Sequence, residues 1–210
     1  MLDLTALHQY CTAHSSPQSD LLYRLDRETH LKTLAPQMSS GELQGRFLSL
    51  LSKLMRPQHI LEIGTFTGYA TLCLAEGLAP DGKISTIEVN PEIRHISQKY
   101  FTESDYAAQI DSYTGDAKTI IPTLATPFDL VFIDAGKNHN DLYYEMVLPL
   151  VKTGGLIITD NVLWRNKVVM GATDRDTQTI QAFNEKVNND TRVENLLLPV
   201  RDGVLIARKL

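Results

Sequence analysis

Residues 60–75 constrain the fold more than any other part of the sequence. Residues 60–63 predict a short buried strand, and a turn bracketed by Gly64 and Gly68 follows it at once. An apolar helical segment, residues 70–75, begins directly after the turn. Glycine lets the backbone come close to a ligand, and the first amides of a helix have no partner inside that helix. Strand, turn and helix N-terminus together predict a binding site.

From residue 59 onward, strand-like and helix-like segments alternate. Strands are expected at residues 60–63, 83–89, 110–114, 130–134 and 156–159, and helices at residues 68–78, 91–103, 117–124 and 140–151. Such alternation predicts a mostly parallel sheet with helices on both faces. After a further helix at 177–189, two apolar runs at 193–198 and 204–208 predict a hairpin and a final antiparallel strand.

Residues 1–57 show no strand pattern and are expected to form a helical extension of an α/β core, residues 58–210. A first short helix starts near Leu4, a second covers residues 21–34, and a third ends before Pro57. Ser39 and Glu42 have the spacing of a capping box at the start of the third helix. The whole chain, 1–210, is expected to be a single domain.

Composition excludes several classes of function. The net charge of −5 gives no basic footprint for nucleic acid, and no apolar run is long enough to cross a bilayer. The N-terminus has no signal-like pattern, so the cytoplasm is the expected location. The two cysteines, Cys11 and Cys73, make no disulfide framework.

The glycine turn favours S-adenosylmethionine over a dinucleotide. In the dinucleotide fingerprint a middle glycine lets a pyrophosphate approach, but here Phe66 occupies that place. Glu88 ends the next strand, about 20 residues after the turn, where an acid accepts hydrogen bonds from ribose hydroxyls. The alternative for Glu88 is a structural acid that caps the turn before Asn90 and Pro91.

Acidic residues also end the fourth and fifth expected strands. Asp134 and the pair Asp160-Asn161 follow sequential strands that one crossover helix joins, so their side chains are expected to meet. Two carboxylates and an amide oxygen form a hard oxygen set that suits Mg²⁺ or Ca²⁺. The alternative is that both acids cap the following loops. Lys137 is either a general base beside this site or a solvated loop lysine.

Four motifs in this order resemble the cation-dependent O-methyltransferases, a family that includes catechol O-methyltransferase and the caffeoyl-CoA O-methyltransferases, and the style is closest to the bacterial members. They are LEIGTFTGY at 61–69, IEVNP at 87–91, FDLVFIDA at 128–135 and GGLIITDNVLW at 154–164. The resemblance covers roughly residues 36 to 210. It implies a doubly wound, mostly parallel seven-stranded sheet of the Rossmann-like methyltransferase type.

The resemblance also implies a set of residues around S-adenosylmethionine. Met38 and Ser40 match the segment that folds over the cofactor, Glu88 matches the ribose acid, and Asp116 and Ala117 would flank the adenine. Residues expected near the methionine part are Glu62, Gly64 and Tyr69; Phe66, Ala70, Val89 and Asp134 complete the cofactor set.

In the same way, Asp134, Asp160 and Asn161 match the metal ligands, and Lys137 matches the catalytic base. The implied reaction is methyl transfer to a hydroxyl of a small aromatic vicinal diol, with Mg²⁺ as the first choice of ion and Mn²⁺ or Ca²⁺ as alternatives. Family members are commonly homodimers.

Two residues depart from the family pattern. Arg46 stands where glutamine is frequent, and Gly136 precedes Lys137 where an acid or a tryptophan is frequent. Because of these departures, the resemblance does not identify the acceptor substrate. The alternatives are a methyltransferase of the same fold with a vestigial metal site, a module that binds the cofactor without turnover, and an NAD-linked oxidoreductase.

Overall fold

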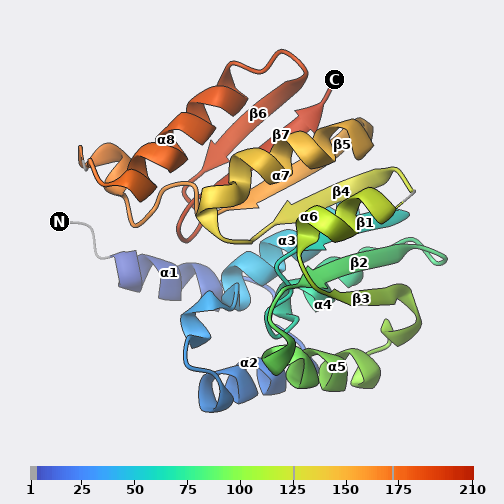
Figure 1. The fold of residues 1–210 in the computed structure, drawn as a ribbon. Helices are drawn as coiled ribbons and strands as arrows, with labels where there is room; N and C mark the ends of the chain where they lie inside the picture. Colours follow the sequence, from blue (N-terminus) through green and yellow to red (C-terminus); the bar gives the residue numbers. More distant parts are fainter. Residues whose placement is uncertain (1–3, 125, 172) are drawn as a thin grey trace.

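The computed structural model of the chain describes residues 4–124, 126–171 and 173–210. A seven-stranded sheet with the order β3-β2-β1-β4-β5-β7-β6 runs through the molecule (Figure 1). All strand pairs are parallel except those of β7 with β5 and β6. The predicted mostly parallel sheet with an antiparallel hairpin is therefore confirmed. The strands are β1 (His59–Ile63), β2 (Lys83–Glu88), β3 (Ile110–Thr114), β4 (Phe128–Ile133), β5 (Val151–Asp160), β6 (Val193–Leu198) and β7 (Val204–Lys209).

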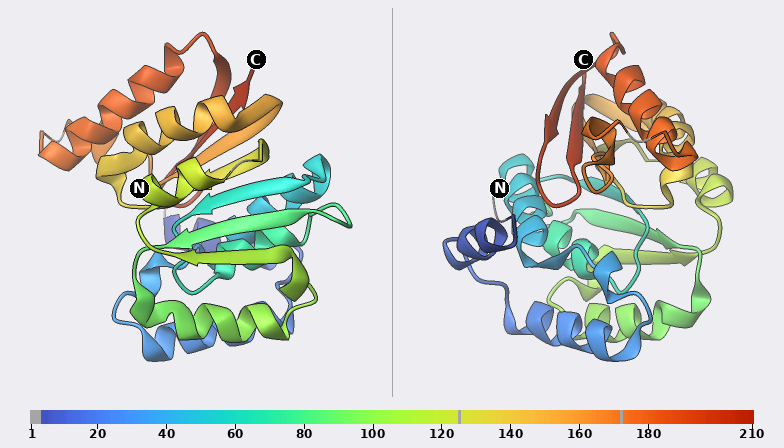
Figure 2. Two further views of the ribbon diagram at one scale, coloured as in Figure 1. Left: turned by 45° about the vertical axis from the view of Figure 1, so that its right-hand side comes forward. Right: turned by 90° about the vertical axis from the view of Figure 1, so that its left-hand side faces the viewer.

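Helices cover the two faces of the sheet (Figures 1 and 2). On one face α6, α7 and α8 pack on the strands, and on the other α3 and α4 do so, with α2 and α5 packed against α4. The helices are α1 (Leu4–Ala13), α2 (Asp20–Lys32), α3 (Gly41–Met55), α4 (Tyr69–Ala75), α5 (Arg94–Glu103), α6 (Ala117–Ile120), α7 (Asn140–Val147) and α8 (Arg175–Asn188). Short 3-10 turns include η1 (Pro36–Met38), η5 (Lys137–His139) and η7 (Lys167–Val169).

Each apolar cluster takes alternate residues of a strand, as a pleated strand requires. Leu61 and Ile63 of β1 face α6, α7 and α8, whereas Ile60 faces α3 and α4. Glu62 shares the orientation of Ile60, so an acid is buried beneath α3 and α4. The alternation that predicted the strand thus also places a carboxyl group in the interior.

Two local predictions were wrong. Ser39 and Glu42 form no capping box: the N-cap of α3 is Ser40, whose side chain makes no capping hydrogen bond, and Glu42 instead accepts from the backbone N–H of Gln18 at 3.1 Å. Strand β5 begins at Val151, five residues before the expected start. The Gly154-Gly155 pair lies inside the strand, where the pairing of β4 and β5 shifts register.

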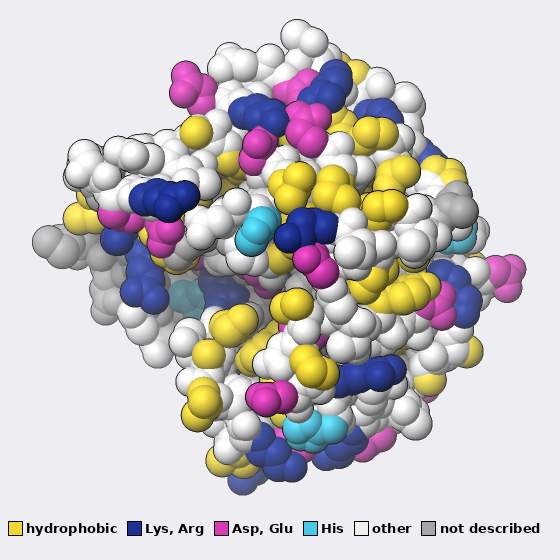
Figure 3. All heavy atoms as spheres, viewed as in Figure 1, with side chains coloured by type: hydrophobic (Ala, Val, Ile, Leu, Met, Phe, Trp, Pro, Cys, Tyr) yellow, Lys and Arg dark blue, Asp and Glu magenta, His cyan; other side chains and the backbone are white. Residues whose placement is uncertain are grey.

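The distribution of charged and apolar residues has two features. Basic and acidic side chains are interspersed on the face that carries α7 and α8 (Figure 3). Over the part of the chain that the structure describes, none of the helices combines the length and apolar character needed to cross a bilayer.

Candidate active site

The candidate site lies where the sheet order reverses, between β1 and β4. Helices leave the carboxyl ends of these neighbours toward opposite faces, and ligands of open α/β sheets bind in the crevice that this creates. Four acids lie at or next to carboxyl ends of strands there, in the order Glu88, Glu62, Asp134 and Asp160 across the sheet.

The turn after β1 requires glycine at position 64. Its φ is +104°, and a Cβ atom there would lie 2.1 Å from the carbonyl oxygen of Asp134. The amide of Gly64 donates to Ile87 O at 2.9 Å, and the amide of Asp134 donates to Ile63 O at 2.9 Å. The turn therefore lies directly against the end of β4.

Glu62 is fully buried, and only one of its two carboxylate oxygens accepts hydrogen bonds from described residues. Its Oε2 accepts from the hydroxyls of Thr71 and Thr86, the latter at 2.5 Å, while Oε1 has no hydrogen-bond partner within the described structure. Burial raises the pKa of Glu62 to about 7, and the two hydroxyls oppose that rise. The site thus holds an acid that titrates near neutrality.

Glu88 accepts hydrogen bonds from the turns after β1 and β2, and Asp116 accepts one from the start of α6. Glu88 accepts from the backbone N–H of Phe66 at 2.7 Å and of Asn90 at 2.8 Å. Asp116 is the N-cap of α6 and accepts from the N–H of Lys118 at 2.9 Å. The structural alternative for Glu88 is therefore realised. It does not exclude ribose, because each carboxylate oxygen can accept more than one hydrogen bond.

Asp134 and Asp160 follow paired residues on neighbouring strands. Ile133 lies opposite Thr159 in the β4–β5 pairing, so the next residue on each strand is one of the two acids. Neighbouring strands lie about 4.8 Å apart, which brings the two carboxylates into one small volume. Burial raises the pKa of both carboxyl groups, and the repulsion between them raises that of Asp134 further. The structure confirms that the two strand ends are neighbours, as the sequence predicted.

A tightly held segment carries Asn161, the third predicted ligand. Val162 N donates to Gly203 O at 3.2 Å and Leu163 N donates to Asp202 O at 2.8 Å, which fixes the segment to the β6–β7 turn. Four non-glycine residues between 161 and 166 have a left-handed backbone: Asn161, Trp164, Arg165 and Asn166. Such conformations cost about 1–3 kcal/mol each and cluster at functional sites.

Two residues of the site were missed by sequence reasoning. Gln44 of α3 is fully buried, and its Nε2 donates to Asp160 Oδ2 at 2.9 Å. Arg201 of the β6–β7 turn donates to Gln37 O at 2.9 Å, and its charge lowers the pKa of both Asp134 and Asp160. Gln44 lies on the buried stripe of α3 with Leu48 and Ser52, four and eight residues on. A glutamine on such a stripe was the signal available in the sequence.

The remaining predicted residues are spread around the crevice. Tyr69 is buried among α2, α4 and α5, and its hydroxyl donates to Gln18 Oε1 at 2.9 Å. Ser40, Ala70 and Ala117 are buried, whereas Met38 and Val89 are exposed. Lys137 begins η5 directly after the Asp134 loop, and its side chain lies outside the described part of the structure.

Arg46 turns away from the site. Its guanidinium makes a two-pronged ion pair, at 2.6 and 3.0 Å, with Glu76, the C-cap residue of α4, and Ser49 and Lys53 donate to the same carboxylate. The departure at this position therefore joins α3 to α4 and does not shape the crevice.

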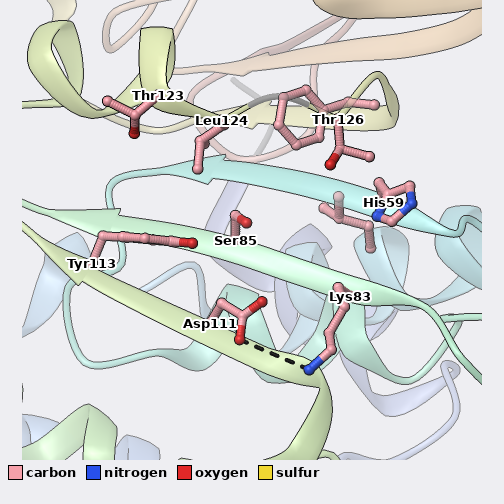
Figure 4. A pocket seen from close by; sticks show the side chains of 10 residues that line it. His59, Lys83, Ser85, Asp111, Tyr113, Thr123, Leu124 and Thr126 are labelled. Atoms are coloured by element: carbon pink, nitrogen blue, oxygen red, sulfur yellow. Dashed lines mark ion pairs between the residues drawn. The ribbon is translucent and has the colours of Figure 1, made fainter.

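A separate cavity of about 260 Å³ lies at the amino ends of β1, β2 and β3 (Figure 4). Lys83 and Asp111 form an ion pair across it at 3.8 Å, and His59 and Thr126 also line it. None of the predicted site residues lies in its wall. The crevice at the carboxyl ends remains the candidate site.

The family model and the similar proteins all indicate the same family. The family model described as "O-methyltransferase" matches residues 12–210. Catechol O-methyltransferase of Niastella koreensis is 35% identical over 182 residues, covering 82% of each chain. Caffeoyl-CoA O-methyltransferase of Eucalyptus gunnii is 31% identical over 97% of this chain and 93% of its own length. Tricin synthase 2 of Oryza sativa subsp. japonica is 35% identical over 82% of this chain, which spans only 64% of that protein.

A solved structure extends the likeness to the whole fold. The SAH-bound methyltransferase PaMTH1 of Podospora anserina superposes with a TM-score of 0.91 at 27% identity, covering 100% of this chain and 98% of its own. Family model, relatives and fold agree with one another and with the four sequence motifs. The chain belongs to the O-methyltransferase family and is a methyltransferase.

Proposed function

We propose that this chain transfers the methyl group of S-adenosylmethionine to a hydroxyl of a small aromatic vicinal diol, with a divalent cation bound in the crevice. The observation that carries the proposal is the pair of carboxylates at the ends of β4 and β5: Asp160, which is buried, and Asp134, which is half-buried. Two buried carboxylates repel each other, and a cation between them offsets both that repulsion and their desolvation.

The donor set fits a hard cation. Asp134, Asp160 and Asn161 offer only oxygen ligands, which suits Mg²⁺, Mn²⁺ or Ca²⁺ better than Zn²⁺. No group of three or more His, Cys, Asp or Glu side chains is arranged to hold a metal among the residues that the structure describes. The proposed site contains only two such side chains, so water and the acceptor would supply the remaining ligands.

The crevice also fits the cofactor. Only glycine fits at position 64 beside the end of β4, and Glu62 Oε1 is a buried acceptor without a partner among the described residues. Glu88 has further acceptor capacity for ribose hydroxyls. Support from relatives is direct, since the neighbour PaMTH1 was solved with SAH bound.

The chemistry divides among few groups. A cation held by Asp134, Asp160 and Asn161 would lower the pKa of the acceptor hydroxyl. Lys137, three residues after Asp134, would accept the proton from that hydroxyl. The turn at Gly64 and the acid Glu88 would hold the sulfonium donor in line with the oxygen. Such positioning is worth up to about 7–11 kcal/mol in well-oriented reactions.

We further propose that the protein acts as a homodimer. Leu156, Leu196 and Ile206 line a groove on the β5–β7–β6 part of the sheet, and Leu50 and Leu54 are exposed on α3, which packs on the same face. A second copy would bury this apolar surface. Light scattering at micromolar concentration tests the proposal, and a monomeric mass would contradict it.

The function itself is tested with labelled S-adenosylmethionine. Catechol and phenol are each offered as acceptor, once with Mg²⁺ and once with EDTA. Turnover of catechol with Mg²⁺ alone is the expected result, because only the diol can chelate the ion. Equal turnover of both phenols in EDTA would remove the cation from the reaction. Binding of S-adenosylhomocysteine without any methylated product would indicate a module that does not turn over.

A further inference from the structure

The side chain of Gln44 is placed as a support for the proposed cation site. It is fully buried on α3, 116 residues away from Asp160 in the sequence, and its Nε2 donates to Asp160 Oδ2 at 2.9 Å. Its Oε1 is buried and has no hydrogen-bond partner in the described structure. A buried acceptor left without a donor costs about 1–3 kcal/mol, so a donor that enters the site would relieve that cost.

The orientation of the Gln44 amide follows from chemistry. Rotation by half a turn would place Oε1 against the carboxylate of Asp160, where two acceptors would face each other. The N–H side must therefore point at Asp160, and the carbonyl oxygen must point away from it. The orphaned oxygen is a consequence of the contact and not of an arbitrary assignment.

Asp160 is held at both of its oxygens. Oδ2 accepts from Gln44, and Oδ1 accepts from the backbone N–H of Asn161 at 2.7 Å. Each oxygen keeps a further lone pair for a ligand. Among the residues that the structure describes, Gln44 thus supplies the only side-chain hydrogen bond to this carboxylate, and it does so without adding a charge. A glutamate at this position would bring a third carboxylate beside Asp134 and Asp160.

We propose that Gln44 is a positioning residue of the cation site: it orients the Asp160 carboxylate through Nε2, and its Oε1 accepts a hydrogen bond from a water or hydroxyl group that enters with the cation. This inference rests on the proposed function. It assigns to α3, which carries none of the predicted ligands, a part in metal binding. Groups that orient a metal ligand typically contribute 10–100-fold to metal affinity.

The test measures Mn²⁺ binding to the purified full chain by electron paramagnetic resonance, with neither cofactor nor acceptor present. Gln44→Met removes both polar atoms at nearly constant volume, and Gln44→Asn keeps the amide but withdraws it by one methylene. Gln109→Leu is the matched control, because Gln109 also donates from Nε2, to Ala79 O and Gly82 O at 3.0 Å, far from the crevice. Circular dichroism and S-adenosylhomocysteine affinity monitor the fold.

Both Gln44 variants are expected to weaken Mn²⁺ binding about 10–100-fold while S-adenosylhomocysteine affinity changes less than about threefold. Gln109→Leu is expected to bind Mn²⁺ like the wild type. Wild-type Mn²⁺ affinity in either folded Gln44 variant would overturn the inference and leave the proposed function standing. A wild-type protein that binds no Mn²⁺ would instead refute the cation in the proposed function, and the inference with it.

Discussion

The two halves of the crevice satisfy their acids in opposite ways. In the β1–β2 half, Glu62 and Glu88 accept hydrogen bonds from the hydroxyls of Thr71 and Thr86 and from two turn amides. In the β4–β5 half, Asp134 and Asp160 follow paired residues of neighbouring strands and repel each other, and the donors to Asp160 are one amide side chain and one backbone N–H. In the first half, the Oε1 atom of Glu62 is left without a hydrogen-bond partner among the described residues. In the second half, the positive charge of Arg201 offsets part of the cost of the two carboxylates, and the proposed cation would offset the rest.

The largest effect is expected from removing one negative charge in the β4–β5 half of the crevice. Asp160→Asn keeps the shape and removes one of two repelling charges, and its single carbonyl oxygen can accept from either Gln44 or the N–H of Asn161. Turnover should fall by more than the 10–100-fold that is typical when a residue that only orients a metal ligand is removed. The cation-free protein should melt at a higher temperature, because the raised pKa of Asp134 comes partly from Asp160.

Asp111→Asn, at the distant cavity, is the control and should change neither property. Scanning calorimetry in EDTA and a methyl-transfer assay measure the two outcomes. A melting temperature that falls together with turnover would show that the two carboxylates do not oppose each other in the folded protein.

The next largest effect is expected at the turn after β1, where Gly64 contacts the end of β4. Gly64→Ala places a Cβ on the Asp134 carbonyl, and the φ of +104° is unfavourable for alanine. Overpacking and backbone strain together should lower the free energy of unfolding by about 3 kcal/mol or more. Gly41→Ala is the matched control, since Gly41 has a φ of +71° with no atom within 4 Å. It should cost only about 1 kcal/mol in urea unfolding, and equal losses would refute the role of the contact.

A smaller effect, dependent on pH, is expected in the first half. The native state keeps the proton of Glu62 up to a pKa of about 7, while the unfolded chain loses it near 4.5. Raising the pH between these values therefore favours the unfolded chain. Glu62→Gln should match the wild type below pH 4.5 and become more stable above it, by on the order of 3 kcal/mol at pH 8. Urea unfolding of both proteins from pH 4 to 8 measures the difference, and a variant less stable at pH 8 would contradict it.

The smallest effect is expected at the rim of the second half. Among the described residues, a Cβ at Gly136 would meet only His139 Nδ1, at 3.9 Å. Gly136→Ala should therefore stabilise the protein by about 0.4–1 kcal/mol through the unfolded chain. If the acceptor occupies the space beside Gly136, the KM for catechol should rise while the Mn²⁺ affinity stays constant. A variant that is clearly destabilised would show that this space is filled by the protein itself.

Local signals predicted much of this arrangement. Strand alternation, turn glycines and acids after strands are short-range patterns, and they located Glu88, Asp134 and Asp160 correctly at strand ends. Gln44 and Arg201 escaped because their roles depend on partners 116 and 164 residues away. The capping box failed for a related reason: Glu42 found a better partner in Gln18 than its own helix offered. Sequence spacing cannot weigh such competing tertiary contacts.

The long separation of these contacts has a kinetic consequence. The hydrogen bonds from Gln44 to Asp160 and from Arg201 to Gln37 close loops of 116 and 164 residues. Closing such loops costs entropy before the contact repays it, so these contacts should form late in folding. Interactions absent from the folding transition state change the unfolding rate and leave the folding rate nearly constant. A cation bound at this end of the sheet would therefore lengthen the lifetime of the folded enzyme without hastening its formation.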